Sequence, residues 1–150
     1  DADFSHNPKD IKRILEPMIE KNYDVSIGSR YIKGINVVNW PLSRIILSYT
    51  ASLYVQLITK MNIKDSTSGY ICYKKSVLES IDLDNIKFTG YAFQIEMKYK
   101  SYLKNFKIIE IPIIFSDRVY GVSKLNGSII SEAIFGVIAM RIKKIFNIKF

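Results

Sequence analysis

The chain has 150 residues, of which 48% are hydrophobic, a size and composition that suit one folded domain and exclude an intrinsically disordered polymer. Its formal net charge of +8 indicates an anionic partner, whether phosphate groups, an anionic membrane surface or nucleic acid. Cys72 is the only cysteine, which excludes an intrachain disulfide, and no uninterrupted run of about 18 to 20 apolar residues predicts a transmembrane helix.

Helices and strands alternate along the predicted chain, a pattern that favours an α/β architecture. In order, the sequence predicts a helix from residue 7 to about 19, a strand over 23–27, a helix over 41–60, a strand over 70–73, a short helix over 75–81, a helix over 92–103, a strand over 107–115 and a final helix over 128–145. Turns or loops are predicted over 28–31, 34–40, 65–69 and 117–127. Asn7 is expected to cap the first helix, with Pro8 at its first position. Pro17 is expected to bend or shorten that helix, and Pro112 to break the last strand.

Two aspartates, Asp1 and Asp3, stand one residue apart at the start of the sequence. At the end of a strand, two such carboxylates could address one hard cation such as Mg²⁺ or Mn²⁺, which keeps several waters and bridges diphosphate oxygens. Taken alone, the pair fits equally a solvated loop in which Asp3 or Ser5 caps a helix.

Three further motifs could contact phosphate. Arg30 follows Gly28 in a predicted turn and could fork onto phosphate oxygens, although a surface arginine paired with a carboxylate explains it as well. Residues 65–69 form a loop of small hydroxyl residues that could approach a ligand closely, or a plain turn. Arg118 and Lys124 lie in a glycine-containing loop that could close over a diphosphate or a lipid phosphate, or be a solvated basic loop.

The segment from Gly90 to Glu96 is predicted to open a helix and to place Gln94 and Glu96 near its N-terminal turn. Glu96 could position an acceptor or act as a base. The alternative is an acidic residue stabilised by the helix dipole.

The order of these motifs resembles that of the polyprenol-phosphate (dolichol-phosphate) mannosyltransferase group of family 2 glycosyltransferases. The similarity runs from Asp1 to about Gly136 and rests on DADFSH, DVSIGSRY, VVNWPLSR, DSTSGYICYKKSVLESIDL, GYAFQIEM and DRVYGVSKLNGSII. The resemblance implies a GT-A fold, a Rossmann-like α/β sheet with the metal motif near its centre. Because family members carry an N-terminal nucleotide-binding half before the paired aspartates, we expect residues 1–150 to be the C-terminal part of a single catalytic domain.

The resemblance also implies roles for the first residues. Asp1, Ala2 and Asp3 match the donor and metal motif, in which the two aspartates address Mg²⁺ or Mn²⁺ and the diphosphate. Ser5 stands where some members carry a glutamine that helps to hold the metal, so water is expected to fill more of the metal shell. His6 is the only histidine, and we expect it to cap or orient this loop rather than abstract a proton.

Further along the chain, Arg30 matches an arginine that contacts the donor. Arg118 and Lys124 match the cationic pair of the mobile acceptor loop, which binds donor or acceptor phosphate. With Asp3, these two residues are the expected catalytic groups. Glu96, an expected substrate-binding residue, and Asp65 match recurrent positions of less defined role.

The implied reaction transfers a sugar, with mannose from GDP-mannose as the expected donor, onto the phosphate of polyprenyl or dolichyl phosphate with inversion. A phosphate monoester with a second pKa of about 6 is largely ionised at neutral pH and needs no strong base. A related transferase using UDP-glucose stays open, because the absent half selects the donor. A non-catalytic basic module for membrane or RNA is less favoured, because the cations are scattered. The 150-residue chain alone is expected to be inactive.

Access to a polyprenyl acceptor implies a peripheral protein at the cytoplasmic face of a membrane. Residues 128–150 combine apolar side chains with Arg141, Lys143, Lys144 and Lys149, which suits an interfacial helix beside anionic lipids. Burial against the domain core is the alternative, since the segment is apolar nearly all round before Arg141. The helix over 41–60 is a second interfacial candidate.

Overall fold

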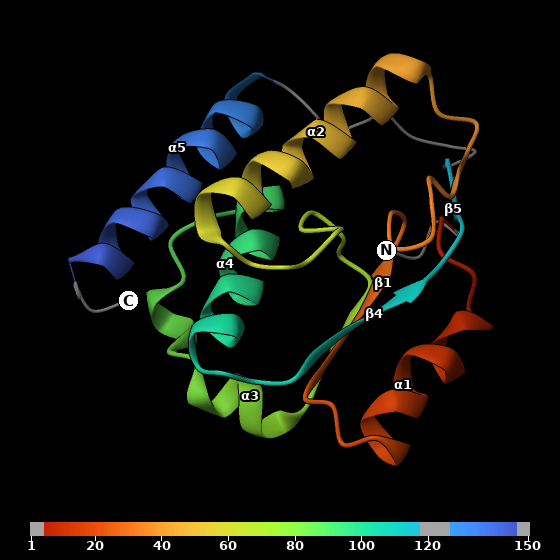
Figure 1. Cartoon of the computed structure of the whole chain (residues 1–150), viewed down its shortest axis with the longest axis horizontal. Coiled ribbons are helices and arrows are strands. Elements are labelled where there is room, and N and C mark those ends of the chain that lie inside the picture. The colour runs from red at the N-terminus through yellow and green to blue at the C-terminus, as the bar shows by residue number, and fades with distance from the viewer. Residues whose placement is uncertain (1–4, 118–126, 147–150) are drawn as a thin grey trace.

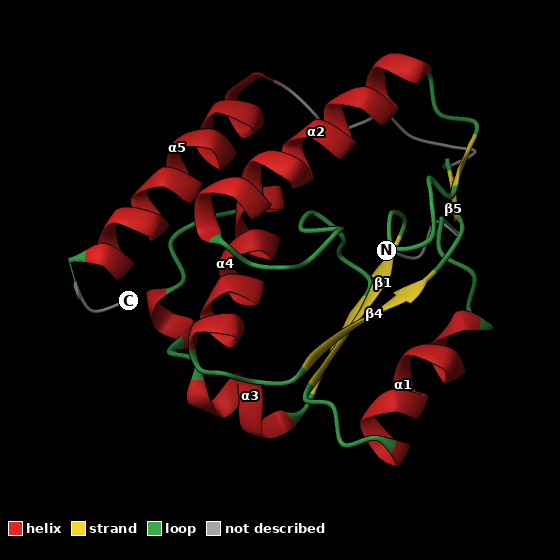
Figure 2. Cartoon of the chain, viewed as in Figure 1, coloured by secondary structure: helices red, strands yellow, loops and turns green. Residues whose placement is uncertain are grey.

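The fold is a mixed α/β structure, as the alternating pattern predicted (Figure 2). The computed structural model describes residues 5–117 and 127–146. Its elements are α1 (Asp10–Glu20), β1 (Val25–Ser29), β2 (Val37–Val38), α2 (Leu42–Thr59), β3 (Ile71–Tyr73), α3 (Lys75–Ser80), the 3₁₀ turn η1 (Leu83–Asn85), α4 (Gly90–Leu103), β4 (Ile108–Pro112), β5 (Phe115–Ser116) and α5 (Gly127–Ile145).

The main sheet has the order β3–β1–β4 and is built around β1. β1 pairs in parallel with β4, with Ile27 opposite Glu110, and antiparallel with β3, with Val25 opposite Tyr73. Parallel pairing requires a long crossover, which α2, α3 and α4 supply between the two strands. Figure 1 shows α1 on one side of these strands and the other long helices on the opposite side. Every residue of β1 is therefore buried.

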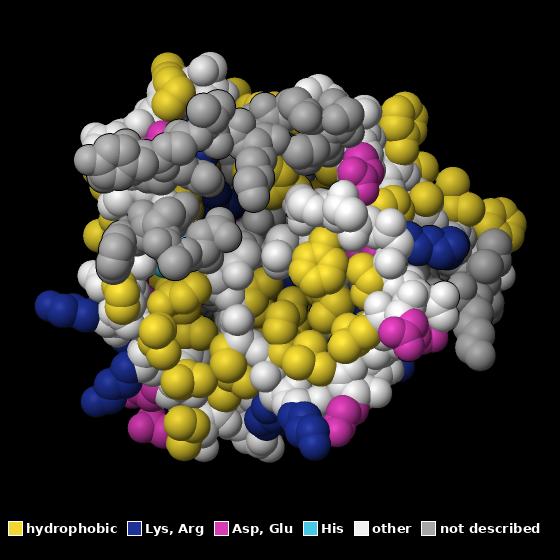
Figure 3. Space-filling model, turned by 180° about the vertical axis from the view of Figure 1, so that it is seen from behind, with side chains coloured by type: hydrophobic (Ala, Val, Ile, Leu, Met, Phe, Trp, Pro, Cys, Tyr) yellow, Lys and Arg dark blue, Asp and Glu magenta, His cyan; other side chains and the backbone are white. Residues whose placement is uncertain are grey.

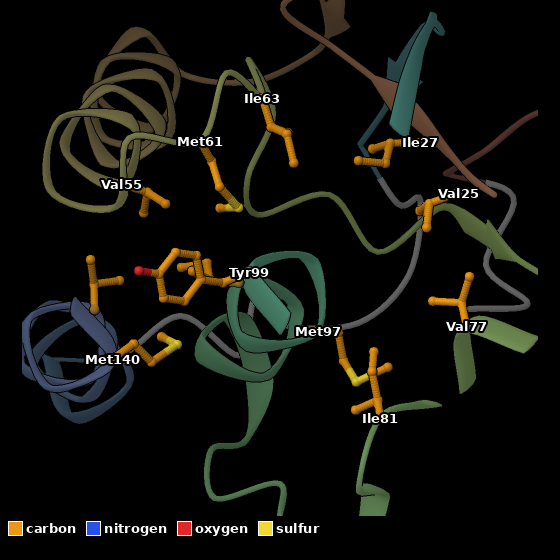
Figure 4. Close-up of a cluster of buried hydrophobic side chains, with 12 residues drawn as sticks. Val25, Ile27, Val55, Met61, Ile63, Val77, Ile81, Met97, Tyr99 and Met140 are labelled. Atoms are coloured by element: carbon orange, nitrogen blue, oxygen red, sulfur yellow. The ribbon is translucent and has the colours of Figure 1, made fainter. Parts of the chain in front are cut away.

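The hydrophobic core surrounds α4, which is buried on several sides. In Figure 4, Tyr99 extends from α4 toward Met140 of α5, whereas Met97 points toward Ile81 beyond α3. The helix also buries Lys98 and other polar side chains, so its stability depends on finding hydrogen-bond partners for them.

Helix α1 begins later than predicted. Asn7 caps the turn that precedes α1 rather than α1 itself: its side-chain oxygen accepts the N–H of Lys9 at 3.0 Å, and its carbonyl accepts the N–H of Asp10. Pro17 lies within α1 without ending it. Its own carbonyl still accepts the N–H of Lys21 at 3.1 Å, which closes the last turn of the helix.

Strand β1 extends further than predicted, through the residues expected to turn. The N–H of Gly28 donates to the carbonyl of Tyr70 at 2.7 Å, and Ser29 pairs with Pro112. A Cβ at residue 28 would lie 2.9 Å from the Tyr70 ring, so this strand position needs glycine for its close packing rather than for a turn.

One face of the described structure is strongly apolar. Figure 3 shows hydrophobic side chains over the centre of the rear face and, separately, at its lower left, where α1 lies, with charged side chains toward the edges. Ile11, Leu15 and Ile19 of α1 are all exposed. Contiguous apolar surface of this kind marks a contact region rather than a solvated face.

Candidate functional site

An apolar groove lies between α2 and α5 and has a volume of about 360 Å³. Tyr54 of α2 joins the two helices by donating a hydrogen bond of 2.9 Å to the carbonyl of Ile134 in α5. The lining residues are Arg30, Trp40, Arg44, Leu47, Ser48, Thr50, Ala51, Tyr54, Val55, Thr67, Tyr91, Ile95, Ile130, Ala133 and Ile134. The groove is therefore aliphatic along the helices and carries two arginines near the start of α2.

Arg30 follows β1 directly and reaches the groove from the end of that strand. Its Nε and Nη2 donate to the two carboxylate oxygens of Asp65 at 2.7 and 2.6 Å, and Nη2 also donates to Thr67 at 2.9 Å. Burial alone would lower the pKa of the guanidinium, but the hydrogen bond and negative charge of Asp65 outweigh burial and raise the pKa. Arg30 is therefore a permanently charged, rigidly held cation beside an apolar cavity.

A second cation, Arg44, packs on the Trp40 ring at the same end of the groove. The guanidinium of Arg44 lies 4.1 Å from the centre of the Trp40 ring, and that of Arg30 lies 5.4 Å from it. Pro41 starts α2 immediately after the tryptophan, which places Arg44 in the first turn of the helix. Nη1 of Arg44 also donates to both carboxylate oxygens of Asp117 at 3.0 Å.

Most of the expected site residues lie outside the described ranges, but the structure describes what flanks them. Those undescribed residues are Asp1, Ala2, Asp3, Arg118 and Lys124. The N–H of Ser116 donates to the carbonyl of Ser5 at 3.1 Å, and His6 forms a β-bridge with Phe115. The segments adjoining the paired aspartates and the cationic loop therefore meet, although more than a hundred residues separate them in the sequence.

The ring of His6 packs against two aromatic side chains. Its ring lies 4.6 Å from that of Tyr70 and 5.0 Å from that of Phe115, measured between centroids. These contacts orient the segment that follows the paired aspartates.

Glu96 is not brought to the groove. Since α4 begins at Gly90, Glu96 lies in its second turn, next to the N-terminal turn as predicted, but its side chain does not line the groove. Its buried carboxylate accepts the N–H groups of Lys87 and Phe88 and pairs with Lys100 at 3.1 Å. The arrangement ties the segment before α4 to the helix.

Sequence reasoning missed Trp40, Arg44 and Ser48 as site residues. Ser48 lines the groove, and its hydroxyl oxygen accepts a hydrogen bond of 2.8 Å from the Tyr31 hydroxyl. The available signal was a tryptophan–proline pair at a helix start with an arginine in the next turn. That pattern predicts the start of a helix, but it does not predict that Arg44 lies beside Arg30, which only the fold determines.

No cluster of three or more His, Cys, Asp or Glu side chains that could hold a metal occurs within residues 5–117 and 127–146. The expected ligands Asp1 and Asp3 lie before those ranges. Their carboxylate oxygens are of the type that Mg²⁺ and Mn²⁺ prefer.

Comparison with known proteins identifies the family. Residues 1–82 match the profile of glycosyl transferase family 2, which is more than half of the chain. The chain is 43% identical over 137 residues to a polyprenol monophosphomannose synthase of Mycolicibacterium smegmatis, covering 91% of this chain and 51% of that protein. It is 41% identical, over the same share of this chain and 56% of the other, to an undecaprenyl-phosphate mannosyltransferase of Micrococcus luteus. The chain thus spans about half the length of the curated relatives it matches.

Proposed function

This chain belongs to glycosyl transferase family 2, and on that premise we propose that the complete protein is an inverting polyprenyl-phosphate mannosyltransferase. The names of the two relatives support mannose as the sugar and a polyprenyl phosphate as the acceptor. The structural observation that carries the proposal is the apolar groove between α2 and α5, which ends at Arg30 and Arg44.

The groove matches the two chemical parts of the acceptor. Its aliphatic walls suit an isoprenoid chain, and the guanidinium groups suit a phosphate. Within the described part of the chain, Nη1 of Arg30 makes no hydrogen bond, so it is the nitrogen that a phosphate oxygen can use. A cavity of about 360 Å³ admits only the start of a long polyprenyl tail, and the remainder stays in the bilayer.

The acceptor phosphate needs orientation more than deprotonation. With a second pKa of about 6 it is largely ionised at neutral pH, so one of its oxygens can attack C1 of the sugar as the nucleoside diphosphate leaves. Arg30 and Arg44 would hold that phosphate in line with the sugar. Because Arg30 lines the groove, we propose this acceptor role for it in place of the donor contact that the resemblance implied. In the described part of the site, Asp65 and Asp117 balance the charges of these two arginines, which lowers the cost of holding them beside an apolar groove.

On the donor side, we propose that Asp1 and Asp3 hold Mg²⁺ or Mn²⁺, with Ala2 between them against the donor. When bound, such an ion supplies electrostatic stabilisation of the departing diphosphate. Arg118 and Lys124 are proposed to neutralise the remaining charge of the donor or acceptor phosphate. The contact of Ser5 with Ser116 supports this grouping, because it joins the segments next to both sets of residues.

We further propose that the described chain is the C-terminal part of a GT-A domain and that a nucleotide-binding half precedes Asp1. Two features support this: β3 is an edge strand of the described sheet, and α1 exposes an apolar stripe. Both surfaces suit additional α/β structure. The 150-residue chain alone would then bind GDP-mannose weakly and transfer no sugar, which calorimetry can test.

The groove is flanked by a surface that suits a membrane. Within the described structure no helix has the length and hydropathy to cross a bilayer. Exposed apolar side chains nevertheless form one stripe on each helix: Leu42, Ile46, Leu53 and Leu57 on α2, and Phe135, Ile138, Ile142 and Ile145 on α5. Arg141 and Lys144 lie beside the second stripe. We propose peripheral binding of this surface to the cytoplasmic face of a membrane, with the lipid phosphate entering the groove from it.

The test is transfer of labelled mannose from GDP-mannose to polyprenyl phosphate by the full-length protein. We expect a mannolipid product, and Arg44→Ala should raise the KM for the lipid at least 10-fold while leaving the KM for GDP-mannose within 2-fold. Preference for UDP-glucose would favour the related glucosyltransferase. Absence of transfer from either donor would reject the proposal.

A further inference from the structure

The loop that connects α2 to β3 determines where Arg30 points. In this Asp65 loop (residues 64–69), the carboxylate of Asp65 is completely buried and accepts three hydrogen bonds from Arg30, one from its backbone N–H and two from its guanidinium. Thr67 of the same loop takes a fourth. The position of the Arg30 guanidinium therefore depends on the position of the Asp65 loop.

Glu110 of β4 forms hydrogen bonds with the first part of the Asp65 loop. Its two carboxylate oxygens accept the backbone N–H groups of Lys64 at 2.7 Å and of Asp65 at 2.9 Å. Hydrogen bonds to an ionised carboxylate are shorter and stronger than neutral ones. This contact fixes the backbone at the residue whose side chain holds Arg30.

Lys98 of α4 forms hydrogen bonds with the second part of the Asp65 loop. The side chain is fully buried, and its Nζ donates to the carbonyls of Ser66 at 2.8 Å and Ser68 at 2.7 Å, with a longer contact of 3.4 Å to the Gln94 carbonyl. Among the described residues it forms no ion pair. A lysine is rarely buried without a carboxylate partner, and this one uses its charge on loop carbonyls.

We propose that Lys98 and Glu110 are positioning residues that act through the Asp65 loop to fix the Arg30 guanidinium for the acceptor phosphate. A carboxylate holds the N–H groups of the loop and an ammonium holds its carbonyls, so opposite charges from two different elements clamp it. Neither side chain lines the groove. The inference rests on the proposed function, because it assigns Arg30 to the lipid phosphate.

The arrangement also predicts a pH dependence of transfer. Burial lowers the pKa of Lys98 to about 7, while Asp65 and Glu110 oppose that change and Arg30 adds to it. Three carbonyl acceptors also favour the charged ammonium. As the pH rises above this value Lys98 loses a proton and one donor, the loop loosens, and acceptor kcat/KM should fall.

The experiment replaces Lys98 by methionine in the full-length protein, which keeps an unbranched side chain of similar volume and removes the ammonium group. Displacement of a substrate-orienting group by about 1 Å can lower the rate about 100-fold, so we expect acceptor kcat/KM to fall between about 10- and 100-fold with the KM for GDP-mannose unchanged. The alkaline decline of acceptor kcat/KM in the wild type should be absent from Lys98→Met.

Lys100→Met is the matched control, because Lys100 is a buried lysine of the same helix that contacts Glu96 and Asn85 instead of the loop. At temperatures below its melting temperature, the Lys100→Met variant should retain the wild-type acceptor kcat/KM.

A spectroscopic readout separates this inference from the proposed function. In protein labelled with ¹⁵N-arginine, the Nε–H signal of Arg30, which donates to Asp65, should exchange slowly with solvent in the wild type and in Lys100→Met and faster in Lys98→Met. If the wild type transfers no mannose, the proposed function fails while this measurement still tests positioning. Should Lys98→Met not fold, Glu110→Gln loosens the loop from its other end and should give the same pattern. Wild-type exchange and wild-type acceptor kcat/KM in a folded variant would overturn the inference.

Discussion

Arg30 combines two roles that the sequence left as alternatives. It is paired with a carboxylate, as a structural arginine would be, and it also lines the groove, as a phosphate-binding arginine would. The two roles are compatible because a guanidinium has five N–H donors in a fixed plane. Asp65 and Thr67 use one edge of that plane and leave Nη1 for a ligand.

A second residue-scale prediction concerns Lys98 and stability. Its pKa is lowered from an ordinary value of 10.5 to about 7 in the folded protein, so between these pH values the unfolded chain binds more protons. The free energy of unfolding should therefore rise with pH across this window through Lys98. Chemical denaturation at about pH 6.5, 8 and 9.5 should show the rise in the wild type and a flatter profile in Lys98→Met.

This sign matters for the interpretation of activity. Stability is expected to increase over the same pH range in which transfer decreases, so unfolding cannot account for the alkaline decline. An equal pH slope of stability in Lys98→Met and wild type would contradict the assignment of the titration to Lys98.

Among the elements, α2 is oriented against its own hydrophobic pattern. Its fully buried positions include Ser52 and Thr59, whereas Leu53 and Leu57 face outward. The buried hydroxyls are satisfied locally, with Thr59 donating to the Val55 carbonyl and Ser52 in contact with Ser66. The leucines are thus available for another apolar surface, which we propose to be the bilayer.

Leu57→Glu should weaken membrane binding without unfolding the protein. Because the side chain is 68% exposed, the change in the free energy of unfolding should be within about 0.5 kcal/mol. Loss of one buried leucine from a bilayer corresponds to about 1.5–3 kcal/mol, or roughly 10- to 100-fold in partitioning. Co-sedimentation with vesicles of phosphatidylcholine and phosphatidylglycerol measures the effect.

Leu83→Glu is the matched control, since Leu83 is similarly exposed but lies in η1, outside the α2 and α5 stripes. Equal losses of vesicle binding in the two variants would show that α2 is not the docking element.

Helix α5 approaches the segment before α4 closely at Gly136. A Cβ at this position would lie 2.9 Å from the ring of Phe88. Gly136→Ala should therefore force the ring or the helix to move and lower the free energy of unfolding by about 1–3 kcal/mol. Thermal unfolding measures the change. A Cβ at residue 127, at the start of α5, would meet no atom within 4 Å, so Gly127→Ala should leave the melting temperature nearly unchanged. A Gly136→Ala protein as stable as the wild type would show that the contact between residue 136 and Phe88 is loose.

At the scale of the whole molecule, the fold joins parts of the sequence that lie far apart. Ser5 meets Ser116, and Arg44 of α2 pairs with Asp117. The segments that adjoin the paired aspartates and the cationic loop are thereby brought to the end of the groove where Arg30 and Arg44 lie. This convergence supports our proposal that one region binds both donor and acceptor.

This convergence predicts separate effects of Asp3→Ala and Arg118→Ala on function and folding. Loss of one electrostatic contact to the transition state typically costs roughly 3 kcal/mol, or about 100-fold in kcat. In the full-length protein each variant should lose at least that much transfer while circular dichroism and melting temperature stay near wild type. Wild-type turnover in either variant, or full transfer with all divalent ions chelated, would contradict the proposed donor site.

Local patterns predicted the elements with strong local signals. The helices around 41–60 and 128–145 are confirmed as α2 and α5, because helix periodicity and a proline start are read within a few turns. Short strands were less predictable. β2 and β5 contain two residues each and exist only by pairing with one another, which no local pattern encodes.

The last helix shows why two readings of one segment could both hold. Burial against the core and exposure to a membrane were alternatives for residues 128–150. In the described part of that segment, Val137 and Met140 are buried, while Phe135 and Ile142 are exposed. A helix that is apolar nearly all round can serve a core and an external apolar phase on opposite faces.

By itself the sequence determined the α/β class, the positions of the long helices, the absence of an intrachain disulfide and the order of motifs that resembles that of polyprenyl-phosphate glycosyltransferases. These follow from residue types and short-range spacing, which are properties of the chain. Only the tertiary structure decided that Arg30 and Arg44 share one end of an apolar groove, that Glu96 lies away from it, and that Lys98 is buried against the Asp65 loop. The physical reason is that ion pairs and hydrogen bonds between distant residues depend on which elements pack together, and packing is settled by the whole core rather than by any one segment.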